Sequence, residues 1–410
     1  MTLRGTAPGE SQIGDGPSEV PVADSTARRD PVARATATVA STILNPSTLV
    51  PLVVVWAVVA LTHILGHDLF TEPIDPAVAA VSFAVILAAI VVAAFRVVQE
   101  AEHLASVLGE PYGTLVLTLS VVVIEVILIV SVMLGPGESP TIARDSLFAV
   151  MMIILNGVMG VALIVGGLRH GPQRYNREGT SQYLAMIAVL TLLALVLPNF
   201  TVSTGAGSFS TGQAIGVAVL AAAAYAVFLW LQTTKNRALF LQPLGARAAA
   251  APAAHAPANR GVTVTHAVLL VLTVLPIVLL SHDLAILTDY GIGMLGAPIA
   301  LGGVLIALIV FTPEAATAIR ASLNNETQRT INLNLGAFVS TVGVTIPAVL
   351  VIGLVTGERV ILGESPANML LIAATLALTV ITFTSRRTNV VHGVLHLALF
   401  GMFALLVFAP

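Results

Sequence analysis

The stretch Leu115–Ile127 reads LVLTLSVVVIEVI and places one carboxylate, Glu125, in an otherwise apolar and hydroxyl-bearing run. The run is part of a longer apolar segment, 112–134, and about 18 apolar residues are enough to cross the hydrocarbon core of a bilayer. A charge at the centre of such a helix costs roughly 2.5–3.5 kcal/mol on insertion scales. The stretch therefore predicts a transmembrane helix whose glutamate faces a bundle interior or an aqueous path.

A second stretch repeats this arrangement. Residues 309–315 read IVFTPEA and place Glu314 well inside the apolar segment 297–320. Pro313 removes a backbone donor, so we expect a local break in the helix with free carbonyl oxygens beside the carboxylate. The other acidic residues fall in the N-terminal tail, in loops or near the ends of apolar runs.

Composition agrees with a membrane protein. The chain has 410 residues, of which 57% are hydrophobic and only 10% are charged, whereas soluble domains average about 25% charged residues. No basic tract suggests a nucleic-acid partner. Cysteine is absent, which excludes disulfides, thiolate metal sites and cysteine nucleophiles.

We therefore expect an all-α integral membrane protein with about eleven transmembrane helices. Residues 1–42 are polar and rich in Pro, Ser and Arg, which is typical of a disordered tail. The expected spans are 43–66, 76–98, 112–134, 144–167, 181–199, 213–233, 263–281, 297–320, 328–355, 367–385 and 390–409.

The basic residues predict the orientation, because Lys and Arg concentrate in cytoplasmic loops. With a cytoplasmic N-terminus and eleven spans, all basic residues lie inside except Arg144 and Arg359. We expect a multi-pass protein of a bacterial plasma (inner) membrane with its N-terminus in the cytoplasm.

The longest interior break, 234–262, divides the chain into two blocks of five helices, 76–233 and 263–410, and leaves 43–75 as one extra helix and its loop. Since five is odd, two such blocks in series have opposite orientations in the membrane. The second helix of each block carries one of the two glutamates. An inverted repeat with a site at mid-membrane is a recurring transporter design.

Two carboxylates with nearby carbonyls, hydroxyls and water would form a hard oxygen site suited to Ca²⁺ or Na⁺. Burial disfavours the charged form of both carboxylates, so a proton and a cation would compete for the same oxygens, which is the basis of antiport. Further polar residues within spans are second-tier ligand candidates: Asn156, Thr118, Ser120, Thr312, Ser340, Thr341 and Thr345.

With these residues in place, the chain resembles the cation/Ca²⁺ exchanger superfamily, most closely the bacterial ChaA-type calcium (sodium, potassium)/proton antiporters. The resemblance rests on 101–125, AEHLASVLGEPYGTLVLTLSVVVIE, and on 311–353, FTPEAATAIRASLNNETQRTINLNLGAFVSTVGVTIPAVLVIG. It implies that Glu125 and Glu314 are the paired acidic residues that bind cation and proton. Many calcium/proton exchangers carry Gly-Asn shortly before the first glutamate, where this chain has Val121-Val122, so its expected shell is poorer in amide oxygens.

The resemblance implies a secondary antiporter with no cofactor that exchanges Ca²⁺, or alternatively Na⁺ or K⁺, for protons. A cation channel with acidic rings and a purely structural membrane protein are alternatives. His392 and His396 have the spacing of a zinc-binding helix, but glycine stands where a protease needs glutamate. We expect an interfacial role for both histidines, with pH sensing or a zinc site as alternatives. The oligomeric state is left open.

Overall fold

The computed structural model describes residues 45–69, 74–108, 112–135, 139–201, 207–242 and 260–409. All of the named elements within these ranges are helices. The expected tail, 1–42, and most of the expected linker lie outside the described residues.

Six helical segments make up the first part of the chain, and the fourth and fifth contain π-helical or 3₁₀ turns. They are α2 (Pro46–Leu69), α3 (Pro76–Leu108), α4 (Tyr112–Met133), α5 (Ile142–Met151) continued by η2 (Met152–Val158) and α6 (Met159–His170), α7 (Arg177–Thr191) continued by η3 (Leu192–Val196) and η4 (Leu197–Phe200), and α8 (Thr211–Thr233) with the short η5 (Arg237–Phe240) after it.

Five helical segments make up the second part. They are α9 (Arg260–Leu295), α10 (Ala300–Leu323), α11 (Thr327–Ser340) continued by η6 (Thr341–Thr345) and α12 (Ile346–Thr356), α13 (Pro366–Thr384) and α14 (Val390–Phe408).

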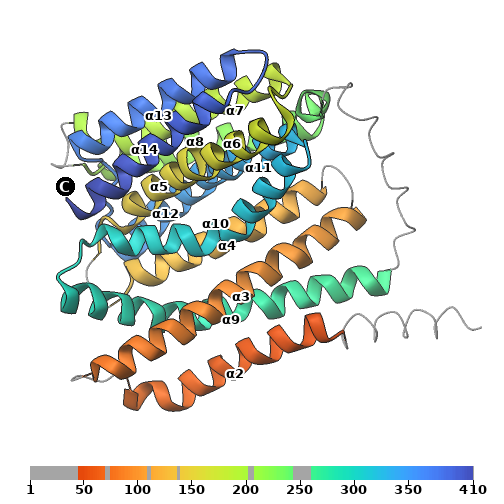
Figure 1. Cartoon of the computed structure of the whole chain (residues 1–410). Helices are drawn as coiled ribbons and strands as arrows, with labels where there is room; N and C mark the ends of the chain where they lie inside the picture. Colours follow the sequence, from red (N-terminus) through yellow and green to blue (C-terminus); the bar gives the residue numbers. More distant parts are fainter. Residues whose placement is uncertain are drawn as a thin grey trace, which may run out of the picture.

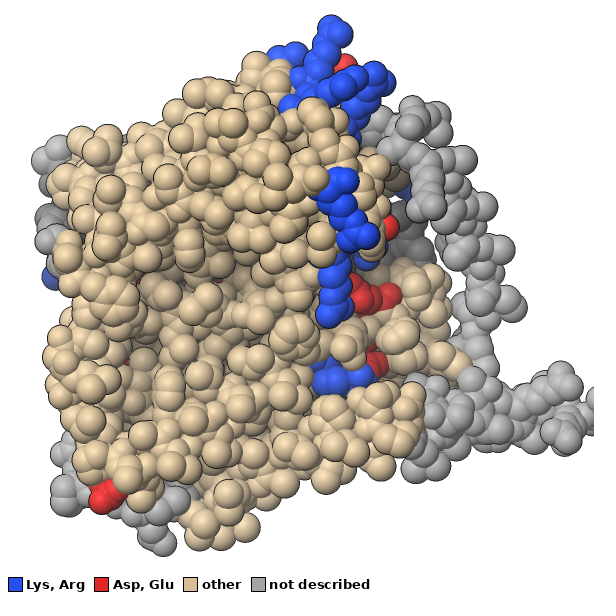
Figure 2. Space-filling view, in the orientation of Figure 1, with Lys and Arg blue, Asp and Glu red and all other residues tan. Residues whose placement is uncertain are grey.

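Within the described ranges, ten of these segments are long and apolar enough to cross a membrane, and α4 adds a shorter apolar stretch, Leu119–Met133. The predicted all-α membrane protein with eleven helical spans is therefore confirmed. Figure 2 shows a broad surface with few charged side chains, with Lys and Arg gathered along one edge of the molecule, here called the arginine-rich side.

Two helices are longer than the sequence pattern predicted. The expected spans 76–98 and 263–281 are the 33-residue α3 and the 36-residue α9. About 20 residues are enough to cross the bilayer, so both helices exceed that length. The extension of α3 beyond residue 98 carries Glu100, which accepts from Nδ1 of His266 of α9 at 2.6 Å and pairs with Arg96.

The helices of the two blocks contact each other in a reciprocal pattern. The first helices, α3 and α9, pack against each other (Figure 1). The second helix of each block packs against the third helix of the other block: α10 lies on α5–η2–α6, and α4 contacts α11–η6–α12. The fifth helices follow the same rule, with α14 on α6 and α8 on α12. This reciprocal packing is the pattern expected of a repeat of two five-helix blocks, and the repeat itself stays a prediction.

The extra helix α2 lies against α3 and α9 at the lower edge of Figure 1. Pro276 has no N–H, so it leaves the carbonyl of Leu272 without its helical donor. Nε1 of Trp56 donates to this carbonyl at 3.1 Å. The side chain of α2 therefore replaces the backbone bond that α9 lacks.

Candidate functional site

Glu125 lies in α4 and is fully buried. Its Oε2 accepts a hydrogen bond of 2.8 Å from Oγ1 of Thr341, which lies in the other block. Its Oε1 is buried and has no hydrogen-bond partner among the described residues. One half of this carboxylate is thus satisfied across the interface of the blocks, and the other half is available to a proton or a cation.

Thr341 opens the π-helical turn η6, which local sequence features explain. Pro347 follows η6 and cannot donate to the carbonyl of Gly343 four residues earlier, so regular α-helical bonding is interrupted there. Gly343 also admits the ring of Tyr225, since a Cβ on it would meet that ring at 2.6 Å. Thr345 is buried in the same turn, and its hydroxyl has no partner among the described residues.

Glu314 lies in α10, which runs without interruption through Pro313. The expected break in this helix is therefore absent, although Pro313 still leaves the carbonyl of Ile309 without a backbone donor. Glu314 Oε2 is buried without a hydrogen-bond partner in the described part of the chain. This carboxylate, unlike that of Glu125, borders a cavity.

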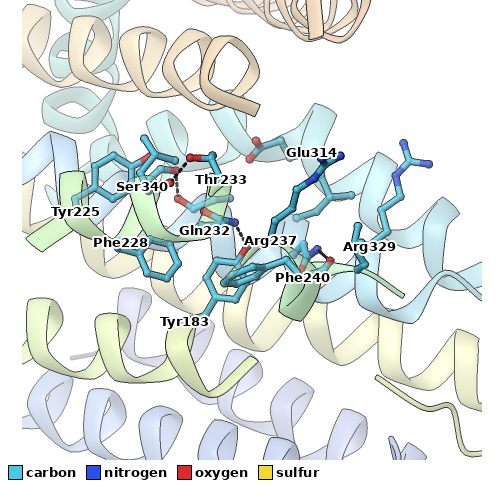
Figure 3. Close-up of a pocket in the computed structure, with 16 residues that line it drawn as sticks. Tyr183, Tyr225, Phe228, Gln232, Thr233, Arg237, Phe240, Glu314, Arg329 and Ser340 are labelled. Carbon is cyan, nitrogen blue, oxygen red and sulfur yellow. Dashed lines mark hydrogen bonds between the residues drawn. The ribbon is translucent and has the colours of Figure 1, made fainter. Parts of the chain in front are cut away.

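The cavity has a volume of about 330 Å³ and is bounded by α7, α8, η5, α10 and α11. Figure 3 shows Glu314 above it, Ser340 and Tyr225 at one end, and Arg329 at the other. The arginines on its lining place its mouth on the arginine-rich side. Other side chains on the lining, which sequence reasoning did not identify, are Tyr183, Phe228, Gln232, Arg237, Phe240 and Asn332.

The short helix η5 forms part of the cavity wall. Phe240 packs edge-on against Tyr183, with ring centroids 5.1 Å apart, and its carbonyl accepts from Nδ2 of Asn332 at 2.7 Å. Nε2 of Gln232 donates to the Tyr183 hydroxyl at 2.5 Å. An aromatic and amide cluster thus lines the same cavity as Glu314.

The two carboxylates lie on helices that touch, since α4 packs against α10. They are close enough for the charge of Glu125 to act on Glu314. Only Glu314 reaches the cavity, so the pair is asymmetric: one glutamate is sealed in the interface and one is open toward a single side.

Asn156 lies in η2, and its amide is already engaged on both ends. Nδ2 donates to Oγ1 of Thr375 at 2.8 Å, and Oδ1 lies 3.0 Å from Nδ1 of His396. His396 in turn reaches Thr382 with Nε2 at 3.1 Å. The structure thus places Asn156 in a buried polar network with α13 and α14.

His396 is fully buried in that network, so the interfacial role expected for it is wrong. Nδ1 of the neighbouring His392 is buried without a partner among the described residues. The described part of the chain contains no group of three His, Cys, Asp or Glu residues placed to hold a metal ion. A zinc-site reading of these two histidines therefore gains no third ligand.

The remaining second-tier residues divide by their contacts. Ser340 lines the cavity with Glu314, although its hydroxyl donates to the carbonyl of Ala337 at 2.7 Å. Ser120 donates to the carbonyl of Val116 at 2.6 Å, and Thr312 is exposed and bonds the carbonyl of Leu308. Both hydroxyls therefore bond to the backbone of their own helix. The side chain of Thr118 lies outside what the structure describes.

Sequence comparison matches this chain to a known family. The model of the sodium/calcium exchanger protein family matches residues 78–234 and 265–409, one segment in each block. A curated relative, the sodium-potassium/proton antiporter ChaA of Escherichia coli, is 36% identical over 323 residues, which cover 79% of this chain and 87% of the relative.

Solved structures share the fold at low identity. The structure of native YfkE has a TM-score of 0.67 and 18% identity, covering 87% of this chain and 99% of its own. The H⁺/Ca²⁺ exchanger CAX has a TM-score of 0.60 and 13% identity, covering 87% of each chain. At these identities the likeness concerns the fold alone.

Proposed function

The chain belongs to the sodium/calcium exchanger protein family, and on that basis we propose that it exchanges a cation for protons at Glu125 and Glu314. It is a transporter and not an enzyme, as its relatives are. The observation that supports the two glutamates most directly is their placement. They lie on touching helices from opposite blocks, each with a buried carboxylate oxygen that has no partner among the described residues.

The proposed mechanism is competition for these oxygens. A carboxylate in a low-dielectric interior is costly unless its charge is neutralised, and either protons or a cation can neutralise it. Because both use the same oxygens, loading one expels the other. The cavity beside Glu314 gives access from the arginine-rich side, and the opposite side must open in another conformation to complete a cycle.

The proposed cations follow from the ligand oxygens at the site and from the relative that the chain resembles. The glutamates and the hydroxyls of Thr341 and Ser340 are hard oxygens, and the amide of Asn156 is engaged elsewhere. Na⁺ or K⁺ is the first candidate, because the relative with 36% identity is a sodium-potassium/proton antiporter. Ca²⁺ is the second, because two carboxylates match a divalent charge and Ca²⁺ prefers oxygen ligands.

We further propose that the arginine-rich side is cytoplasmic and that the membrane is a bacterial inner membrane, because Lys and Arg concentrate in cytoplasmic loops. With eleven spans, a reporter that is active only in the cytoplasm should be silent when it is fused to the C-terminal end of α14. Strong reporter activity there would reverse the proposed orientation.

The test of the two glutamates is exchange in everted vesicles. We expect Glu125→Gln and Glu314→Gln each to abolish cation-driven proton movement, since each removes one of the two proposed exchanging charges in a medium where Coulomb interactions are several-fold stronger than in water. The exposed Glu178 provides a matched control, and Glu178→Gln should retain full exchange. Near-normal exchange by either core variant, at equal expression, would refute the proposed site.

The same vesicles distinguish antiport from a channel. An antiporter uses an imposed proton gradient to accumulate the cation against its own gradient, whereas a channel only passes the cation down its electrochemical gradient and needs no proton gradient. Adding Na⁺, K⁺ or Ca²⁺ separately to vesicles with a preset proton gradient will rank the cations by the proton release that each one drives. Proton release that Ca²⁺ drives and that Na⁺ and K⁺ do not drive would favour Ca²⁺ as the exchanged cation.

A further inference from the structure

Another buried carboxylate, that of Glu364, lies outside the membrane-spanning helices, in the segment between α12 and α13. The backbone of this segment is fixed from several directions. The backbone N–H of Glu364 donates to the carbonyl of Leu195 at 2.9 Å, and the backbone carbonyl of Glu364 accepts from Nδ2 of Asn199 at 2.7 Å. The neighbouring Gly363 approaches Gly207 so closely that a Cβ would meet its Cα at 2.5 Å. Backbone hydrogen bonds and close packing thus fix the position of Glu364.

Glu364 shares one guanidinium with a second acid. Nε of Arg144 lies 3.8 Å from Oε2 of Glu364, whereas Asp145 holds the same guanidinium at 2.8 Å. Asn368 donates to Oε2 at 2.8 Å. Oε1 is buried and has no hydrogen-bond partner in the described ranges. Two acids and one base leave a net negative charge in a buried place unless one acid carries a proton.

Glu364 is the acid with the poorer contacts. Asp145 has the shorter ion pair and also accepts from Thr141 at 2.8 Å. Burial raises the pKa of Glu364 from an ordinary value of 4.5 to about 7, with Asp145 adding to the rise, while Arg144 and the bond from Asn368 oppose it. Arg144 and Asp145 are the charged groups that act on it.

The cluster touches the helix that carries Glu314. A Cβ on Gly303 of α10 would meet the backbone N of Ser146 at 2.5 Å and the carbonyl carbon of Asp145 at 2.6 Å. Gly303 lies about three turns before Glu314, toward the end of α10 that is remote from Arg320 and the arginine-rich side. The contact between α5 and α10 therefore lies toward the side opposite the cavity, and the ion pair of Arg144 links it to Glu364.

We propose that Glu364 is a proton-binding site distinct from the transport site, and that its proton holds the side opposite the cavity closed. In the closed conformation the carboxyl is buried. When α5, α10 and the segment between α12 and α13 separate, water reaches it and it ionises. Opening therefore releases the proton, and an alkaline medium on this side promotes opening.

The direction of the pH effect on opening follows from the linkage between proton binding and conformation. The pKa is higher in the closed conformation than in an open, hydrated one, so protonation stabilises the closed conformation. The closed state is most favoured at low pH and loses this advantage as pH rises through about 7. With a pKa of about 7 closed and 4.5 open, the ratio of open to closed molecules rises about tenfold between pH 6 and pH 8.

The test uses thiol labelling, because the chain has no cysteine. Ser146→Cys places a single thiol in the α5–α10 contact, where the native side chain is fully buried. Thr356→Cys places a reference thiol at the exposed end of α12. The labelling rate at position 146 divided by that at 356 cancels the ordinary pH dependence of thiols. In full-length protein we expect this ratio to rise about tenfold from pH 6 to pH 8.

Glu364→Gln fixes the neutral form. It should keep the ratio low and equal at both pH values, whereas Glu358→Gln, which alters an exposed carboxylate of the same segment, should behave like the parent. A flat ratio in the parent, or a tenfold rise that persists in Glu364→Gln, would overturn the proposal. The inference rests on the proposed function only in that an exchanger opens to this side. Labelling needs no transport, so a flat ratio with intact exchange refutes the proton latch alone, and lost exchange in vesicles with the expected labelling refutes the function alone.

Discussion

Oγ1 of Thr341 donates to Oε2 of Glu125 over 2.8 Å, and the two residues belong to different five-helix blocks. The second helix of one block thereby has its buried carboxylate satisfied by the third helix of the other. The bond also joins a candidate transport residue to a π-helical turn, an irregularity that often accompanies functional sites. The hydroxyl therefore sets the position of one carboxylate oxygen before any cargo binds.

Replacing Thr341 with valine should weaken cation binding. Valine keeps the shape but removes the donor, and hydrogen bonds to charged groups contribute about 1.5–3 kcal/mol. We expect the apparent KM for the cation to rise by about ten-fold or more, with little loss of expression. Thr341→Ser retains the hydroxyl and should stay near the parent. An unchanged KM in Thr341→Val would show that the bond does not shape the cation site.

Gly303→Ala should damage both stability and exchange. The added Cβ meets backbone atoms of α5 at 2.5–2.6 Å, and backbone cannot rotate away as a side chain can. Overpacking of this kind costs about 1–3 kcal/mol, which a lower thermal midpoint in detergent will report. Gly291→Ala in α9 is the matched control, because a Cβ there has no neighbour within 4 Å. Equal effects of the two substitutions would contradict the close contact of α5 and α10.

Trp56→Phe should loosen α2. The change leaves the carbonyl of Leu272 without the indole donor that compensates for Pro276, and an unmet backbone group is costly where no water can reach it. We expect a loss of about 1–3 kcal/mol in thermal unfolding. The chain has only two tryptophans, and Trp230 is 54% exposed. Trp230→Phe should therefore change stability by less than about 0.5 kcal/mol.

The free energy of unfolding should carry the signature of Glu364. Its folded pKa of about 7 lies above the ordinary 4.5, so its contribution to stability is present at low pH and is lost as pH rises through 7. Relative to Glu364→Gln, the parent should lose roughly 2–3 kcal/mol between pH 5 and pH 8. Parallel stability profiles for the two proteins would mean that Glu364 is hydrated in the folded state.

Hydropathy predicted the spans because a bilayer demands long apolar runs, and that demand is written in each segment separately. The extension of α3 was missed because Glu100, beyond the expected end of the span, pairs with Arg96 and His266, and only the packed structure shows that these polar residues are compensated. The glutamates could be identified as a pair because no apolar helix carries a carboxylate without a reason.

The contacts around the site could not be predicted in the same way. Nothing local to Asn156 indicates that Thr375 and His396 engage its amide, because those residues come from helices more than 200 positions away. The π-helical turns also escaped prediction, since they depend on a widened backbone and not on a side-chain period. Proline at 313 predicted a broken helix, yet α10 continues through it, because helices in a bundle can tolerate one missing bond.

The reciprocal contacts between the blocks have a consequence for biogenesis. When α4 leaves the ribosome, Thr341 has not yet been made, so Glu125 must enter the membrane without the donor that will later satisfy it. A neutral, protonated carboxyl is the form that can wait there. Until the second block is translated, α4 therefore holds a carboxyl whose partner Thr341 is missing. A chain truncated after α8 should therefore be degraded by quality-control proteases, because the buried carboxyl of Glu125 in α4 has no partner from the second block.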